Sequence, residues 1–189
     1  GGHTTETLRT GAFAGRQVTF FDGGNVTFTR EALDALDGFD EYLDIGGTDD
    51  AAHRLAGLDR GVEWRPAFAV VREEGERVAD HIGGQSDAPA WGLQYRALAY
   101  GLAKNYGARP TVVAHGLRRA GSDALAVFKE VLRGEATPSA WTSNGRAVLT
   151  NIAAGTEDGL RARAADPSPR RNPNGVSTRM DRVVSRFEP

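Results

Sequence analysis

Residues 37–55 read DGFDEYLDIGGTDDAAHRL and place six carboxylates ahead of the first cation, Arg54. Like charges this close repel one another unless a cation, a ligand or backbone N–H groups compensate them. Gly46 and Gly47 interrupt the acidic run just before a pattern that predicts a helix beginning at about Thr48. The stretch is therefore either a well-capped surface turn or a functional site.

Runs typical of strands and helices flank this stretch on both sides. A helix over residues 30–36 is predicted from Thr29, a good N-cap, and Gly38, a stop signal, and the helix after the acidic loop is expected to end at Gly61. Four short runs predict strands: QVTFF (17–21), GNVTF (24–28), VEWRP (62–66) and AFAVVRE (67–73).

The sequence changes character after about residue 84. Apolar residues recur at helical spacing over 91–106, 113–131 and 141–152, which predicts three helices. The stretch DPSPRRNPNGVSTR (166–179) is rich in proline and glycine and predicts a linker or extended tail. The predicted organisation is an α/β unit over 1–84, a helical extension over 85–165 and a basic tail or linker over 166–189.

Composition excludes several classes of protein and of site. The chain has no cysteine, which excludes disulfides, thiolate zinc sites and cysteine nucleophiles. No apolar run approaches the roughly 18 residues that a membrane-spanning helix needs, and no signal-peptide core is visible, so we expect a cytoplasmic protein. A peripheral contact with the cytoplasmic face of the membrane stays open.

Charge is distributed unevenly along the chain. Residues 31–60 carry a net charge of −7, whereas residues 161–189 carry +4. Five arginines near the C-terminus are suited to phosphates of a nucleotide, a lipid carrier or a membrane surface, although a solvated tail is the commoner outcome. They are Arg170, Arg171, Arg179, Arg182 and Arg186.

The order strand, strand, helix, acidic loop, helix, strand resembles the second half of the catalytic domain of family-2 glycosyltransferases, which have the GT-A fold. Residues 84–165 look most like the helical extensions of archaeal members, and the clear part of the resemblance covers residues 17–106. The matching motifs are Gly23-Gly24-Asn25, Arg30, Gly38-Phe39-Asp40-Glu41, Gly47-Thr48-Asp49-Asp50 with Arg54, WRPAFAVVRE (64–73) and YRALAYGLAKNYG (95–107).

The resemblance implies an acceptor-side half of a GT-A domain followed by an α-helical extension. The implied activity is transfer of a sugar from a nucleotide sugar to an acceptor hydroxyl of a glycan or to a polyprenyl phosphate, with no role for nucleic acid. A divalent cation, Mg²⁺ or Mn²⁺, is implied for the complete enzyme, and His81 is a weak candidate ligand. The implied site residues are Asp50 and Asp49 as catalytic acids, and Gly24, Asn25, Arg54 and Asp40 for substrate binding.

The chemistry of the acidic motif agrees with that role. Glycosyl transfer to an alcohol needs a base that removes the acceptor proton, and a carboxylate at a helix N-terminus stays ionised because the free N–H groups stabilise it. Asp50 is the first choice and Asp49 the second. The same acids also suit a simple helix cap, because Asp49 with His53 and Asp50 with Arg54 are i,i+4 pairs. A calcium loop is disfavoured because the spacing of the acids does not fit.

Three departures from the family keep other functions open. The donor-side half with its Asp-x-Asp motif is missing from this sequence, Thr48 replaces an acid, and Arg72 stands where the family often has histidine. The alternatives are a non-catalytic module that binds a glycan or a protein, and a subunit whose donor half comes from a partner chain.

Overall fold

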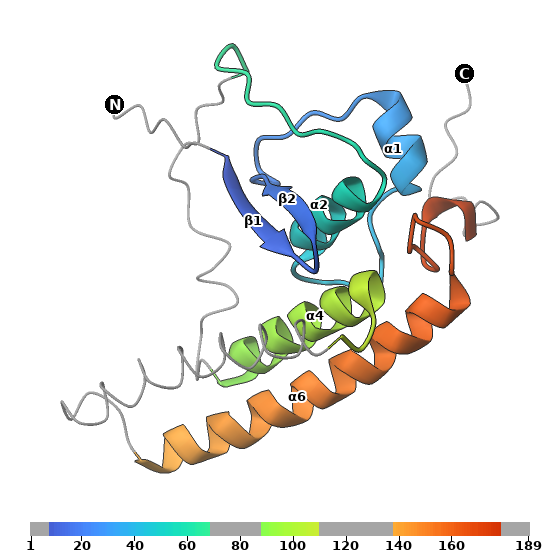
Figure 1. The fold of residues 1–189 in the computed structure, drawn as a ribbon. Coiled ribbons are helices and arrows are strands. Elements are labelled where there is room, and N and C mark those ends of the chain that lie inside the picture. The colour runs from blue at the N-terminus through green and yellow to red at the C-terminus, as the bar shows by residue number, and fades with distance from the viewer. Residues whose placement is uncertain (1–7, 69–87, 110–137, 179–189) are drawn as a thin grey trace, which may run out of the picture.

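The computed structural model describes residues 8–68, 88–109 and 138–178, and combines helices with one small antiparallel sheet (Figure 1). The elements, in chain order, are β1 (Arg9–Phe13), β2 (Arg16–Phe20), α1 (Arg30–Leu36), α2 (Gly47–Gly57), α4 (Ala88–Tyr106), α6 (Pro138–Ala165) and a 3₁₀ turn, η1 (Val176–Thr178). None of the described helices is both long and apolar enough to span a membrane.

The sheet is a hairpin in which Arg9 lies opposite Phe20 and Phe13 opposite Arg16. Its two-residue turn has positive φ at both positions, 49° at Ala14 and 87° at Gly15, as a tight hairpin turn requires. The predicted strand over 17–21 is confirmed as β2, one residue earlier. Its partner is β1, which the sequence did not predict.

Two predicted strands are wrong. Residues 24–28 contain no strand because Asp22 forms a turn there, its Oδ1 accepting the Gly24 N–H at 2.8 Å. Residues 62–66 are also irregular, and the Phe68 N–H bonds the Arg65 carbonyl at 2.9 Å to close a turn that contains Pro66. Most of the run over 67–73 lies outside the described residues.

The predicted helices agree better with the structure. Thr29 caps α1 as expected, with its side chain accepting from the Ala32 N–H. Helix α2 begins one residue before Thr48 and ends at Gly57, four residues before the expected end, because Asp59 adopts a left-handed conformation (φ 55°). Helices α4 and α6 contain the predicted helical stretches 91–106 and 141–152, and the stretch 113–131 lies outside the described residues.

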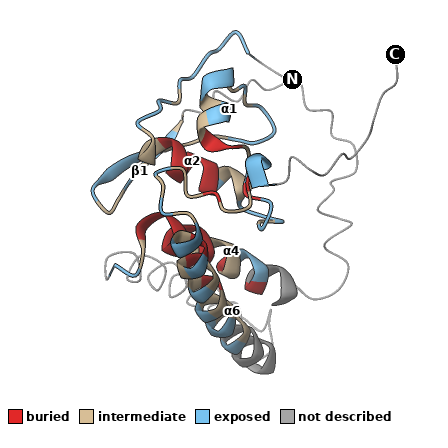
Figure 2. Ribbon diagram, turned by 90° about the vertical axis from the view of Figure 1, so that its right-hand side faces the viewer, coloured by how far each residue is buried: buried red, intermediate tan, exposed pale blue. Residues whose placement is uncertain are grey.

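Helix α2 lies between the hairpin and α4, and α6 runs along α4 (Figure 1). The close approach of α4 and α6 depends on two glycines of α6. A Cβ at Gly155 would lie 2.2 Å from the Arg96 carbonyl oxygen, and a Cβ at Gly159 would lie 2.4 Å from that of Tyr100. Buried residues are concentrated in α2 and in the part of α4 beside it (Figure 2).

The C-terminal segment, residues 166–178, lies against the acidic loop instead of extending into solvent as the linker prediction supposed. The Asn172 side chain donates to the Asp37 carbonyl at 2.9 Å, and the Ser177 N–H donates to the Asp37 carboxylate at 2.8 Å. The Asn174 side chain donates to the Asp40 carboxylate at 2.9 Å. Local composition favours a tail, but these distant acceptors hold the segment in place.

Candidate functional site

Four charged side chains are buried together beneath the acidic loop. Asp40, Asp50, Arg54 and Lys104 are all at most 2% exposed. Asp40 comes from the loop before α2, Asp50 and Arg54 from α2, and Lys104 from α4. With two acids and two bases the cluster is formally neutral, which is the condition under which charges are tolerated in a core.

Lys104 joins the two acids of this cluster. Its Nζ lies 2.5 Å from Oδ2 of Asp40 and 2.8 Å from Oδ2 of Asp50. Arg54 Nε donates to the same Asp50 oxygen at 2.9 Å, which confirms the predicted i,i+4 pair. The other Asp50 oxygen accepts from the Asn105 side chain at 2.8 Å. Both oxygens of Asp50 are therefore engaged.

Arg54 also links α2 to the end of α1. Its two terminal nitrogens donate to the Leu36 carbonyl at 2.6 Å and to the Gly38 carbonyl at 2.9 Å. These carbonyls lie at the C-terminus of α1, where a positive charge is favourable for the helix dipole. The cluster thus fixes three segments of the chain relative to one another.

Asp40 is held ionised by its neighbours. Burial alone would raise the pKa of the Asp40 carboxyl group, but the Lys104 charge and hydrogen bonds from Lys104, Tyr100 and Asn174 bring it below its ordinary value. Burial, and then the nearby Asp40 charge, raise the pKa of Tyr100, so this side chain stays a neutral donor to Asp40 at 2.7 Å.

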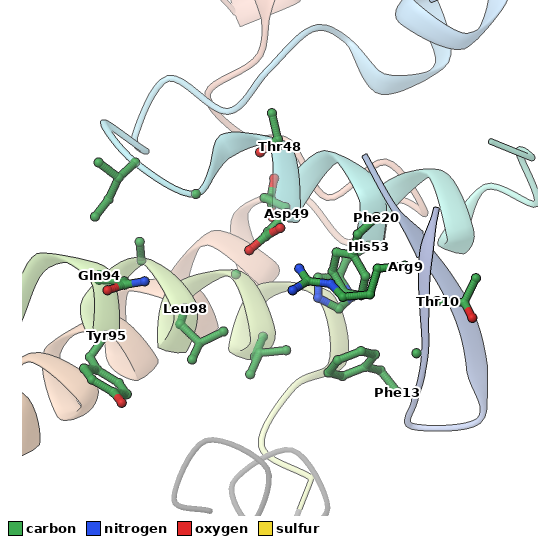
Figure 3. Close-up of a pocket in the computed structure, with 17 residues that line it drawn as sticks. Arg9, Thr10, Phe13, Phe20, Thr48, Asp49, His53, Gln94, Tyr95 and Leu98 are labelled. Carbon is green, nitrogen blue, oxygen red and sulfur yellow. The ribbon is translucent and has the colours of Figure 1, made fainter. Parts of the chain in front are cut away.

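A cavity of about 700 Å³ opens between the hairpin, the start of α2 and α4. Its walls combine apolar side chains such as Phe13, Phe20 and Leu98 with a few polar groups. Figure 3 shows the Asp49 carboxylate and the Arg9 guanidinium pointing into this space from α2 and from β1. Mostly apolar walls with a few charged groups are typical of small-molecule sites.

Asp49 and Asp50 both line the cavity but differ in their surroundings. Asp49 is exposed in the first turn of α2, whereas Asp50 is buried in the ion cluster. The residue before the helix, Gly46, has φ 75°, a conformation that side-chain-bearing residues rarely adopt. Because consecutive residues of a helix point in different directions, Asp49 faces outward and Asp50 faces inward.

The wall of the cavity also contains His53. Its Nδ1 lies 2.7 Å from the Tyr106 hydroxyl, and its ring meets Phe13 and Phe20 edge-on at 4.8 and 5.5 Å between ring centres. Burial raises the pKa of Tyr106 to about 12. The Tyr106 hydroxyl thus holds the imidazole ring of His53 in the wall of the cavity.

The structure brings together only some of the predicted site residues. Gly24 and Asn25 do not line the cavity: Asn25 donates to the Phe68 carbonyl at 3.1 Å. Arg54 and Asp40 lie in the buried cluster behind the cavity. His81 lies outside the described residues. The sequence did not identify Arg9, His53 or Lys104 as site residues. Lys104 belongs to the Lys104-x-Tyr106-Gly107 motif, but that motif does not indicate which acids it pairs with.

The described residues contain no group of three His, Asp or Glu side chains that could hold a metal ion. The acids of the loop are separated instead, since Asp40 and Asp50 share Lys104 while Asp49 faces the cavity. The Mg²⁺ or Mn²⁺ ion that the resemblance implied belongs to the complete enzyme, and its candidate ligand, His81, lies outside the described residues.

Comparisons of the chain with models of protein families, with curated proteins and with solved structures give no match.

Proposed function

We propose that this chain supplies the acceptor side of a glycosyltransferase of the family-2, GT-A type. The reaction is transfer of a sugar from a nucleotide sugar to a glycan hydroxyl or to a polyprenyl phosphate. The observation that carries the proposal is the position of the Gly47-Thr48-Asp49-Asp50 motif, which opens α2 at the mouth of a cavity of about 700 Å³. A glycosyltransferase that acts on a hydroxyl acceptor needs a base such as a carboxylate at such a place.

The base in this proposal is Asp49, whereas the sequence favoured Asp50. Asp49 is exposed and lines the cavity, and it lies in the first turn of α2, where the helix dipole favours a negative charge. Both oxygens of Asp50 already accept hydrogen bonds from Arg54, Lys104 and Asn105. Asp50 is therefore assigned as a positioning residue that fixes the start of α2.

The proposed reaction uses Asp49 as its base. Asp49 accepts the proton of the acceptor hydroxyl, the oxygen attacks the anomeric carbon, and the bond from that carbon to the nucleoside diphosphate breaks. A polyprenyl phosphate acceptor is already ionised and needs no base, and Arg9 supplies a positive charge near it.

The small sheet supports the idea of an incomplete domain. Within the described residues, β1 and β2 pair only with each other, so each has an edge that no described strand covers. A two-stranded hairpin is marginally stable alone, and here β2 packs on α2. Donor-side strands, from the same protein or from a partner chain, would extend such a sheet.

The second candidate is a binding module that holds a glycan in the same cavity without turnover. The observation that favours it is the buried ion cluster. Asp50 is paired with Arg54 and Lys104 in that cluster, which leaves Asp49 as the acid of the motif that faces the cavity. Phe13 and Phe20 on the wall offer apolar surface against which a sugar ring can pack.

One experiment separates the two candidates. The full-length protein is mixed with nucleotide sugars and with either oligosaccharides or polyprenyl phosphates, and glycosylated product is measured by mass spectrometry. Asp49→Asn removes the proposed base, and Asp44→Asn is the control because Asp44 is an exposed acid of the same loop that does not line the cavity. Glycosylated oligosaccharide that is lost in Asp49→Asn and retained in Asp44→Asn supports a transferase with Asp49 as its base, and glycosylated polyprenyl phosphate, which needs no base, also supports a transferase. Glycan binding without product supports the module. If the protein neither binds glycans nor forms product, both candidates are contradicted.

A further inference from the structure

Four arginines from separate parts of the chain converge where α4 and α6 end. Arg16 begins β2, Arg109 follows α4, Arg163 lies in the last turn of α6, and Arg171 lies in the segment after α6. None of the four lines the cavity described above. An inference about them is therefore independent of the proposed function.

Two of these arginines are fixed by backbone carbonyls at helix ends. Arg163 Nη1 donates to the Lys104 and Asn105 carbonyls, at 3.0 Å each, at the end of α4. Arg171 Nη1 donates to the Asp166 carbonyl at 3.1 Å, just beyond the end of α6. Capping of helix C-termini accounts for both contacts, and in each of them the donor is Nη1 of the guanidinium group.

The other two arginines reach the same region from the hairpin and from the turn after α4. A Cβ at Gly57 would lie 2.8 Å from Arg16 Nη1 and 3.9 Å from the Pro169 carbonyl oxygen. The Arg16 guanidinium group and Pro169 therefore both lie next to Gly57, and Pro169 belongs to the same segment as Arg171. A Cβ at Gly107 would lie 3.4 Å from Arg163 Nε, and Arg109 follows Gly107 in the same turn, its N–H bonding the Gly107 carbonyl at 2.9 Å. Capping does not explain Arg16 or Arg109.

The four arginines have no acidic partner among the described residues, which is also true of Arg9, Arg60 and Arg146, and what sets the four apart is that they lie close to one another. Six arginines of the described residues pair with a carboxylate: Arg30, Arg54, Arg65, Arg96, Arg161 and Arg170. No carboxylate among residues 8–68, 88–109 and 138–178 lies within ion-pair distance of the four at the helix ends.

This arrangement is unfavourable in the absence of an anion. Burial lowers the pKa of Arg163 most, and three nearby positive charges lower it further. These charges belong to Arg171, Arg109 and Arg16. Arg171 also has φ 53°, a left-handed backbone conformation that is unfavourable in a residue with a side chain.

We infer that Arg16, Arg109, Arg163 and Arg171 form a binding site for a phosphate-bearing ligand. Guanidinium groups bind phosphate oxygens through two parallel N–H bonds, and Arg is preferred to Lys for such contacts. Arg163 and Arg171 provide fixed donors because the helix ends hold them. Arg16 and Arg109 are exposed side chains that close on the ligand.

The test uses the full chain and two phosphate probes. Binding of inorganic pyrophosphate is measured by calorimetry, and binding to phosphatidylglycerol vesicles is measured by flotation against phosphatidylcholine vesicles. Arg16→Gln/Arg109→Gln removes two of the four charges without touching the helix caps. We expect it to weaken binding about tenfold or more. The control, Arg30→Gln/Arg161→Gln, removes the same net charge from exposed arginines elsewhere and should leave binding within about twofold of the wild type.

The two probes identify the source of the phosphate. Variant-sensitive binding of pyrophosphate supports a soluble ligand, and variant-sensitive binding of anionic vesicles alone supports a lipid headgroup. The inference is overturned if the wild type binds neither probe, or if the two double variants bind equally, since net charge or helix capping then explains the four arginines. Unfolding curves of both double variants verify that each is folded.

Discussion

The Lys104 ammonium nitrogen lies 2.8 Å from Oδ2 of Asp50, and neither side chain is more than 1% exposed. Fifty-four residues separate the two in the sequence. The same nitrogen contacts Asp40, so one cation of α4 neutralises two acids that lie on either side of the Gly46–Gly47 pair. The crowding of carboxylates in the acidic loop is relieved from outside the loop, by a helix that follows it.

Replacement of Lys104 by methionine should destabilise the protein by about 3 to 5 kcal/mol, because it leaves two buried carboxylates without their shared cation. Urea denaturation of the full chain measures the change. Arg161→Met is the control, since its ion pair with Glu157 is exposed and should contribute at most about 1 kcal/mol. Equal stability of the two variants would show that the cluster is dispensable.

Asp49→Asn and Asp50→Asn should separate catalysis from stability. Asp49→Asn should leave the free energy of unfolding nearly unchanged and lower the rate of glycosyl transfer to a hydroxyl acceptor by about 10² to 10⁴. Asp50→Asn should lower the stability, because it removes a charge that is buried against Arg54 and Lys104. The assignment of Asp49 as the base fails if its asparagine variant retains full turnover in a protein that is active.

The free energy of unfolding should decrease as the pH falls below about 4. Asp40 has a pKa in the folded protein below its unfolded value of 3.8, so the unfolded chain binds more protons in this range. The contribution of Asp40 is present in full above 3.8 and is lost as the pH falls through the lower, folded value. Denaturation curves between pH 7 and pH 2 measure it, and Asp40→Asn should show a shallower decrease. An equal slope in both proteins would assign the dependence to other acids.

Gly155→Ala should destabilise the packing of α4 on α6. The added Cβ would lie 2.2 Å from the Arg96 carbonyl oxygen, so the two helix backbones must move apart, at a cost of about 1 to 3 kcal/mol or more. Gly61→Ala is the control, because a Cβ there meets no atom within 4 Å. Thermal unfolding of the two variants makes the comparison, and matching transitions would mean that the helices tolerate a wider spacing.

The sequence by itself determined those features that depend on neighbours a few residues apart. The helical spacing of Tyr95, Leu98 and Leu102 predicted α4, and the i,i+4 spacing of Asp50 and Arg54 predicted their ion pair, since one helical turn brings such residues together. Thr29 predicted the start of α1 for the same local reason. The resemblance to a glycosyltransferase also came from short motifs, and it stays a prediction.

Only the tertiary structure decided which of these residues are buried and what they contact. Residues 24–28 have strand-forming side chains, yet a single hydrogen bond from Gly24 to Asp22 gives a turn, and the partner of β2 is Arg9–Phe13. Local propensity is weak compared with such contacts. Pairing of Lys104 with Asp40 and Asp50 depends on the packing of α4 against α2, because no pattern within one segment specifies which distant charge will share its burial.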